Sequence, residues 1–235
     1  MNPIKLVIFD MDGLMFDTGQ LAYKSYLEAA KKFDFSLNHF VYYYLTGRRD
    51  LEIRNRMKDL YGEDQPVNVW RDQMSLSKKT ILLSEQRVYK KKGLLELIEF
   101  LKQKNIMIAI ASSSSRKLID YYFEIENMKN EFDFVTSGED VKNGKPDPEI
   151  FLKTCQKANV APENTLVLED SVVGVHAALV GKMYAIQVPD DISNLPTYEG
   201  KIPIKLSEKD WQDMDLKVPV CKDLLEVKEF INLII

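Results

Sequence analysis

Cysteine and histidine are scarce in this sequence of 235 residues, which contains two of each. Cys155 and Cys221 lie far apart and lack the spacing of metal ligands, and neither His39 nor His176 is paired with a cysteine or an acid. This scarcity argues against a zinc site and against a Ser-His-Asp triad. Both cysteines are expected to be buried thiols in a reducing compartment, so we expect a cytoplasmic protein.

Excess positive charge and long apolar runs are also missing. The net charge is −4 at pH 7, which leaves no electrostatic footprint for nucleic acid, so we expect no nucleic-acid partner. No apolar run approaches the length of a membrane span, and residues 4–9 are too short for a signal peptide. We therefore expect no membrane partner. The basic run Lys90-Lys91-Lys92 is interpreted as a solvated face at the start of a helix.

Five short apolar runs predict buried strands. They cover residues 5–9, 106–111, 132–135, 165–168 and 183–188. Runs that are apolar on both faces are typical of strands covered by helices on both sides of a parallel sheet. Helical periodicity occurs between the runs; in residues 171–181, Ser171 can cap the helix start and Gly181 can end it in a left-handed conformation. The alternation predicts an α/β fold with a Rossmann-like, doubly wound parallel sheet.

A helical insertion follows the first predicted strand. No convincing strand occurs between Asp17 and Arg87. Four helical patterns cover residues 22–33, 41–45, 51–60 and 70–81. An insertion at this point would lie over the carboxyl edge of the sheet, where α/β proteins bind ligands, so we interpret it as a lid. The predicted domains are an α/β core, residues 1–16 and 88–235, and an all-helical cap, residues 17–87.

Asp10 and Asp12 flank Met11 directly after the first predicted strand. If the extended geometry continues, a spacing of two places both carboxylates on the same side. Two carboxylates this close repel each other unless a cation offsets the charge. A divalent metal would hold Asp10 ionised and leave Asp12 more readily protonated, which suits a nucleophile and a general acid/base. Gly13 permits the sharp change of backbone direction that such a site needs.

A lone Asp-x-Asp has other interpretations, because the pattern also occurs in turns and in the metal sites of glycosyltransferases. An EF-hand is excluded, since Leu14 stands where a ligand belongs and the later acidic positions are absent. The residues that follow later strands distinguish these alternatives.

Two of the later segments have the chemistry of a phosphate site. Ser112 and Ser113 come directly after the second core strand, where hydroxyl and backbone N–H groups at a helix start can hold phosphoryl oxygens. Lys145 precedes a helix start fixed by Pro146 and can offset negative charge on a phosphate and on the nucleophile.

A second acidic pair follows the fourth predicted strand. Glu169 and Asp170 directly abut this apolar strand, where buried acids are costly unless they are paired or bind a metal. Together with Asp10 they form an oxygen-rich set of ligands suited to Mg²⁺.

Taken in order, these motifs resemble the haloacid dehalogenase (HAD) superfamily, and the resemblance spans nearly the whole chain. The signatures are Phe-Asp-Met-Asp-Gly-Leu-Met-Phe-Asp-Thr (9–18), Ala-Ser-Ser-Ser (111–114), Gly-Lys-Pro-Asp-Pro-Glu-Ile-Phe (144–151) and Leu-Glu-Asp-Ser (168–171). The helical insertion is similar to the C1 cap of the branch that contains β-phosphoglucomutase, phosphoglycolate phosphatase and pseudouridine-5′-phosphatase.

The resemblance implies a role for each motif. Asp10 would attack phosphorus and form an aspartyl-phosphate. Asp12 would act as general acid and then general base, and its backbone carbonyl would also bind Mg²⁺. The implied phosphate-binding residues are Ser112, Ser113 and Lys145, and the implied metal ligands are Asp10, Asp12, Glu169 and Asp170.

The resemblance also bears on the group that accepts the phosphoryl group. β-Phosphoglucomutases carry a histidine four residues after the threonine of the first motif, a lysine before the cap glycine and an arginine three residues after it. The corresponding residues here are Ala22, Thr46 and Asp50, around Gly47. These departures favour a Mg²⁺-dependent phosphatase acting on a small phosphorylated metabolite, a sugar phosphate or a nucleotide-like monophosphate. A β-phosphoglucomutase-type phosphosugar mutase is the alternative.

Other segments have weaker interpretations. Arg48 and Arg49 lie on the cap loop and are candidates for binding an anionic substrate, although surface arginines also serve solubility. The Tyr42-Tyr43-Tyr44 cluster is interpreted as cap packing. Residues 201–235 are expected to form a final strand and helix with no assigned function. A phosphorelay receiver would need no lid, and a non-catalytic binding module would not need the complete set of motifs.

Overall fold

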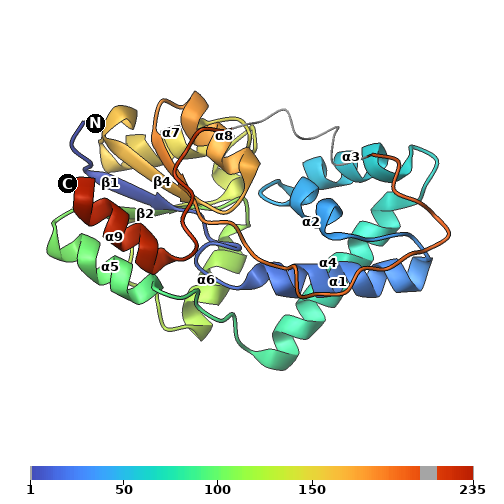
Figure 1. The fold of residues 1–235 in the computed structure, drawn as a ribbon. Coiled ribbons are helices and arrows are strands. Elements are labelled where there is room, and N and C mark those ends of the chain that lie inside the picture. Colours follow the sequence, from blue (N-terminus) through green and yellow to red (C-terminus); the bar gives the residue numbers. More distant parts are fainter. Residues whose placement is uncertain (1, 207–215, 235) are drawn as a thin grey trace.

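The computed structural model describes residues 2–206 and 216–234, and within them a five-stranded parallel sheet forms the centre of the molecule (Figure 1). The strands are β1 (Leu6–Phe9), β2 (Met107–Ala111), β3 (Phe134–Thr136), β4 (Thr165–Glu169) and β5 (Tyr184–Gln187). Their order in the sheet is β3-β2-β1-β4-β5, and every pairing is parallel. The predicted doubly wound α/β sheet is confirmed.

Helices cover both faces of the sheet. On one face lie α5 (Leu94–Gln103), α6 (Arg116–Ile125) and α9 (Leu224–Ile234), and on the other α7 (Glu149–Ala158) and α8 (Val172–Val180). The side chains of β1 alternate between these layers: Val7 and Phe9 join the apolar cluster of the first face, and Leu6 and Ile8 that of the second. All four are fully buried, which explains why the strand is apolar along its whole length.

The strand register determines where polar residues meet. β1 lies between β2 and β4, and Phe9 at its end is level with Ile110 and Leu168. The carboxyl ends of the three strands therefore meet at one edge, which is where parallel α/β sheets bind ligands.

Helix α8 confirms one predicted end and corrects the other. The Ser171 hydroxyl accepts a hydrogen bond from the N–H of Gly174, as expected of an N-cap. Gly181, however, has φ −73°, and the left-handed residue is Lys182 with φ 62°. The N–H of Gly181 still bonds to the carbonyl of Ala177, so the chain reverses one residue later than predicted.

The predicted helical cap is confirmed. Its helices are α1 (Thr18–Phe33), α2 (His39–Leu45), α3 (Asp50–Tyr61) and α4 (Val67–Glu85). They enclose their own apolar cluster, in which Trp70 stacks on Phe35 with ring centroids 4.3 Å apart. Tyr42 and Tyr44 are buried in this cluster, as packing residues should be. Of the described helices, none has the length and apolar character needed to cross a bilayer.

Residues 190–206 form a strap that runs from the core along the cap, drawn in orange in Figure 1. Ile192 is fully buried in the cap cluster, and single-residue bridges join Ile202 to Phe35 and Tyr198 to Leu37. The strap belongs to the segment predicted as core, yet its side chains pack against the cap. The domain boundaries drawn from the sequence therefore stay a prediction.

The carboxyl-terminal stretch departs from expectation in part. Its predicted helix is α9, but the expected strand is reduced, within residues 216–223, to one bridge between Val220 and Gln187. Residues 207–215 lie outside the described part of the chain.

The basic run before α5 is not simply solvated, so that prediction is wrong. Lys90 pairs with Glu126 at 2.6 Å, and Lys91 pairs with Asp190 at 2.5 Å. The side chains of these two acids are 2% and 1% exposed. Both lysines therefore fasten the second connection between cap and core, and only Lys92, 70% exposed, lies largely in solvent.

Candidate active site

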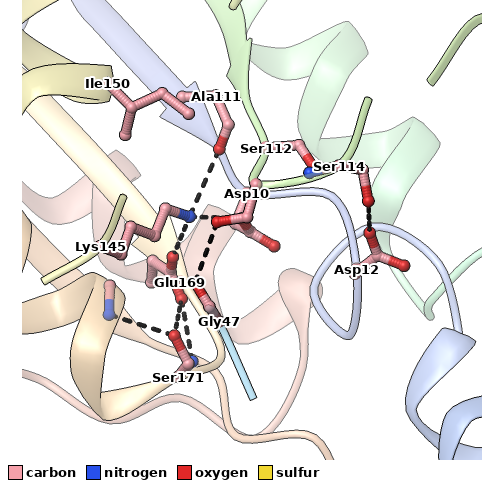
Figure 2. A network of polar contacts seen from close by, with 12 residues as sticks. Asp10, Asp12, Gly47, Ala111, Ser112, Ser114, Lys145, Ile150, Glu169 and Ser171 are labelled. Carbon is pink, nitrogen blue, oxygen red and sulfur yellow. Dashed lines mark hydrogen bonds and ion pairs between the residues drawn. The ribbon is translucent and has the colours of Figure 1, made fainter. Parts of the chain in front are cut away.

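Asp10 and Asp12 lie at the end of β1 and in the turn that follows. Asp10 is 5% exposed. Figure 2 shows its carboxylate directed toward Lys145, whereas Asp12 contacts Ser114. The two acids thus have different partners, because the extended backbone of β1 ends at Phe9 and does not continue past Asp10. Both residues nevertheless line the same cavity, so a shared side for the two carboxylates stays a prediction.

The turn itself is as predicted. Gly13 has φ +87°, in the left-handed region that favours glycine, and a side chain there would collide with the carboxylate of Asp170. Its N–H is held by the hydroxyl of Thr18 at 3.1 Å. The turn brings the first motif against the residues that follow β4.

Lys145 connects two buried acids. Its side chain is 0% exposed, and its ammonium donates to Asp10 Oδ1 at 2.5 Å and also to Glu169 (Figure 2). A longer contact of 3.4 Å reaches the carbonyl of Ala111. Burial opposes the charge of Lys145, but Asp10 and Glu169 outweigh this effect and raise its pKa. A buried ammonium is tolerated only with such partners.

Three buried acids could hold a metal ion. Oxygens of Asp10, Glu169 and Asp170 all lie within 4.8 Å of one another. Burial, opposed by Lys145, raises the pKa of Asp10 to about 7. Burial also raises the pKa of Asp170 well above its usual range, and the nearby acids add to the effect. Among the described residues, the buried Oδ1 of Asp170 has no hydrogen-bond partner. A divalent cation would offset this repulsion, and the all-oxygen donor set fits Mg²⁺.

The three acids are not equally free to coordinate. Both oxygens of Glu169 accept hydrogen bonds, one from Lys145 and the other from the N–H and hydroxyl of Ser171 at 2.9 and 2.8 Å. Asp10 and Asp170 keep more lone pairs unused. The geometry therefore favours these two as the side chains in closest contact with a cation, with Glu169 orienting Lys145.

Asp12 faces the cap. Its Oδ2 accepts a hydrogen bond from the Ser114 hydroxyl at 2.7 Å, and its Oδ1 lies 3.4 Å from the ammonium of Lys78 on α4. Burial raises the pKa of Asp12, but Lys78, Ser114 and Thr18 together lower it below the usual value. Without a cation, Asp10 is therefore the more readily protonated acid of the two. The predicted order, in which Asp12 is the more readily protonated acid, applies to a site with a divalent cation beside Asp10 and stays a prediction.

The two predicted phosphate-binding serines have different surroundings. Ser112 is 1% exposed, and its hydroxyl accepts a hydrogen bond from the N–H of Ser114. The hydroxyl of Ser113 instead donates to the carbonyl of Gly47 on the cap loop at 2.9 Å. Ser113 therefore joins cap to core in this structure, while Ser112 lies at the edge of the sheet beside Asp10 (Figure 2). A phosphate-binding role for either serine stays a prediction.

The two cap arginines also differ. Arg49 donates to the carbonyls of Val141 and Lys142 at 3.3 and 2.8 Å and pairs with Glu52, so it fastens the cap loop to the core. Arg48 donates to the carbonyl of Tyr44, and no acid of the described chain lies within ion-pair distance of it. Of the two, Arg48 is the one whose charge remains available to an anionic substrate.

A cavity of about 680 Å³ lies between cap and core. The core contributes Asp10, Asp12 and Ser112 to its wall, and the cap contributes Arg48 and Lys78. Apolar cap residues complete the wall: Ala22, Leu45, Ile53, Met74 and Leu82. The volume suits a small metabolite.

Two lining residues were missed from the sequence. Lys78 lies within the helical pattern predicted for residues 70–81 and directly follows Ser77, which is buried in α4, so helical periodicity placed it only at the border of the buried face. Tyr122 on α6 is fully buried, lines the cavity, and carries a hydroxyl that makes no hydrogen bond of regular geometry among the described residues. No local sequence signal distinguishes such a tyrosine from a packing residue.

Sequence comparisons identify the family to which the chain is related. The sequence model of a family described as haloacid dehalogenase-like hydrolase matches residues 7–188. A phosphorylated carbohydrates phosphatase of Thermotoga maritima is 31% identical over 183 residues, which cover 74% of this chain and 80% of that protein. Hexitol phosphatase B of Escherichia coli is 28% identical over 193 residues, covering 80% and 85%.

Structural comparisons agree on the fold. A β-phosphoglucomutase from Clostridium difficile superposes with a TM-score of 0.70 at 20% identity, over 99% of this chain and 100% of that one. CbbY from Rhodobacter sphaeroides, solved in complex with phosphate, also gives 0.70 at 20% identity, over 95% and 96% of the two chains.

Proposed function

Because the chain belongs to the haloacid dehalogenase-like hydrolase family, we propose that it is a Mg²⁺-dependent phosphatase of a small phosphorylated metabolite. The observation that carries the proposal is the buried group of Asp10, Lys145, Glu169 and Asp170 at the carboxyl edge of the sheet, of which Asp10 reaches the wall of the cavity. The names of two relatives, a phosphatase of phosphorylated carbohydrates and a hexitol phosphatase, support a sugar or polyol phosphate over a nucleotide-like one.

The residues of the site divide the reaction between them. Asp10 attacks phosphorus as the bond to the leaving oxygen breaks, and Asp12 gives that oxygen a proton. A water then attacks the aspartyl-phosphate, and Asp12 takes the proton of this water, which restores both acids and releases phosphate. Lys145 offsets the charge of Asp10 and the phosphoryl oxygens. Asp10 and Asp170, with Glu169 beside them, would hold Mg²⁺, which would supply further charge neutralisation.

A phosphosugar mutase would use the same first step but return the phosphoryl group to a sugar. Ala22 lines the cavity and offers no acid/base group there. Asp50 is paired with Arg54 and Arg71 at 2.6 and 2.8 Å. These contacts support hydrolysis as the outcome of the cycle.

The test is a panel of phosphorylated metabolites, including both glucose phosphates, assayed for free phosphate with and without Mg²⁺. We expect Mg²⁺-dependent release of phosphate from at least one sugar or polyol phosphate. Asp10→Asn should lower turnover by a factor on the order of 10⁴ or more, with the melting temperature retained. Interconversion of the two glucose phosphates without free phosphate would establish the mutase instead.

A further inference from the structure

The hydroxyl of Tyr122 is a buried polar group that the proposed reaction leaves unexplained. Tyr122 is 0% exposed, and its ring packs edge-on against Phe16 with centroids 5.8 Å apart. Among the described residues its hydroxyl makes no hydrogen bond of regular geometry, and the group that lies close enough to lower its pKa is the ammonium of Lys78. A buried hydroxyl without a well-placed partner is destabilising, so its retention at a cavity wall calls for a partner that arrives with the ligand.

Lys78 lies beside this hydroxyl and reaches the site from the cap. Its ammonium is 3.4 Å from Asp12 Oδ1, and its charge also acts on Tyr122. An ammonium offers three donors, and the long contact with Asp12 engages one of them. The Lys78 side chain is 27% exposed, and it forms part of the cavity wall. Lys78 and Tyr122 together therefore present donors at one point of the wall.

The position of Lys78 and Tyr122 relative to Asp12 indicates which part of a bound substrate they would contact. Lys145 and Asp10 mark where phosphorus binds, and Asp12 lies on the other side of Asp10 from Lys145 (Figure 2). In the proposed reaction Asp12 protonates the leaving oxygen, so the carbon bonded to that oxygen must lie beside Asp12. Groups that flank Asp12 from the cap and from α6 consequently face the first carbons of the leaving alcohol, not the phosphate.

The protonation of Tyr122 decides how its hydroxyl can bind a ligand. The cap wall of the cavity is mixed, with the apolar Ala22, Met74 and Leu82 beside the polar Ser25 and Arg71. Burial raises the pKa of Tyr122 to about 12, so at neutral pH its hydroxyl keeps a proton and can both donate and accept. A single hydroxyl of a ligand, with one lone pair toward Lys78 and its proton toward the oxygen of Tyr122, would satisfy both residues.

We propose that Lys78 and Tyr122 form a subsite for the hydroxyl on the carbon next to the phosphorylated carbon. The substrate class is therefore a phosphate monoester of a polyhydroxylated alcohol with a neighbouring free hydroxyl. This inference rests on the proposed phosphatase function, because that function places the leaving group beside Asp12. A site that hydrogen-bonds a substrate hydroxyl rejects the analogue that lacks it.

The experiment compares phosphate esters that differ by this one hydroxyl. One pair is glucitol 6-phosphate and its 5-deoxy analogue, and the other is glycerol 3-phosphate and 3-hydroxypropyl phosphate. The native enzyme should prefer the hydroxylated ester by roughly 10- to 100-fold in kcat/KM. Tyr122→Phe should reduce that preference to about 3-fold or less, mainly by slowing the hydroxylated ester. The melting temperature should not fall, because a hydroxyl without a regular hydrogen bond is removed and the ring is kept.

Tyr121→Phe is the matched control, since Tyr121 also lines the cavity and loses the same atom. It should leave the preference between the two esters unchanged. Lys78→Met should also reduce the preference for the hydroxylated ester. It should in addition lower kcat/KM for both esters, because Lys78 contacts Asp12. Equal hydrolysis of hydroxylated and deoxy esters by the native enzyme, or an equal loss on both in Tyr122→Phe, would overturn the subsite while leaving the phosphatase intact. Failure of the native enzyme to release phosphate from any ester would instead overturn the proposed function.

Discussion

The charged groups at the sheet edge differ from those at the interface of cap and core. At the sheet edge, Lys145 and its partners Asp10 and Glu169 have side chains that are 0%, 7% and 0% exposed, with the Lys145–Asp10 contact at 2.5 Å. At the interface, Lys78 and Asp12 are 27% and 29% exposed and 3.4 Å apart.

This difference matches what each region must do. Removing one member of a fully buried ion pair leaves an uncompensated charge and is strongly destabilising, so the sheet edge keeps one arrangement. A hydrated and longer pair is weaker, and its partners can be exchanged for groups of a ligand. The core therefore fixes the chemistry, whereas the cap provides contacts that can be remade when a substrate binds.

After Asp10→Asn, the largest loss of turnover is expected for Asp12→Ala, which tests whether Asp12 takes part in the chemistry of the core. With an alkyl phosphate, which needs a proton on its leaving oxygen, turnover should fall by about 10²- to 10⁴-fold. With p-nitrophenyl phosphate, whose leaving group needs no proton, the first step should survive. We then expect a burst of one equivalent of nitrophenol followed by a stall at the aspartyl-phosphate. Full turnover of both esters by the variant would remove Asp12 from acid/base catalysis.

The next largest effect is expected from Mg²⁺, which should raise the free energy of unfolding by binding to acids of the core. At about 100 times its Kd, a ligand of the native state adds about 2.7 kcal/mol to the free energy of unfolding. Asp170→Asn should remove most of this stabilisation, because the amide that replaces the buried carboxylate has no negative charge to attract the cation. Asp191→Asn, at an exposed acid, is the control and should keep it. Thermal unfolding with and without Mg²⁺ measures the stabilisation of both variants. If Mg²⁺ raised the melting temperature of Asp170→Asn as much as that of the native protein, the cation would bind elsewhere.

The same contrast explains which features the sequence could predict. Asp10, Ser112 and Glu169 each stand at the end of an apolar strand, and parallel strands end at a common edge, so local pattern was enough to bring them together. The roles of Lys90 and Lys91 were not predictable, because their partners Glu126 and Asp190 lie 36 and 99 residues away.

Cap residues were harder to assign for a related reason. Periodicity identified the buried stripe of α4, but a residue at its border such as Lys78 faces either solvent or the cavity according to how the cap sits on the core. The strap of residues 190–206 has no strand or helix among its described residues, so periodicity offered nothing to show that Ile192 packs in the cap cluster.

Arg49→Met tests whether the contact that holds the cap loop against the core contributes to substrate binding. Arg49 ties the cap loop to the carbonyls of Val141 and Lys142, just ahead of Lys145. Its loss should lower kcat/KM by about 10-fold, the value of one or two partly hydrated charge-assisted hydrogen bonds, with most of the change in KM.

Arg54→Met is the matched control: Arg54 is 23% exposed against 25% for Arg49, and its ion pairs with Asp50 and Asp72 lie within the cap. Equal kinetic losses in both variants would contradict the role of Arg49.

Glu126→Gln should give the smallest effect and probes the connection between the two regions. Glu126 accepts hydrogen bonds from Arg87, the N–H of Val88 and Lys90, at 3.2, 3.3 and 2.6 Å. Burial raises its pKa, but these donors outweigh burial and lower it below 4.5. The lysine and arginine are 25% and 55% exposed, so hydration weakens each pair, and we expect a loss of about 1 kcal/mol at pH 7.

The pH dependence of the stability lost in Glu126→Gln shows whether the charge of Glu126 or its packing stabilises the fold. Because the pKa of Glu126 is lower in the folded than in the unfolded chain, its charge stabilises the fold fully above the unfolded value of 4.5. The contribution disappears as the pH falls through the folded value. Urea unfolding of the native protein and Glu126→Gln should therefore differ most near pH 7 and converge in acid. A difference that persists at low pH would mean that packing, not charge, joins α6 to the connection between cap and core.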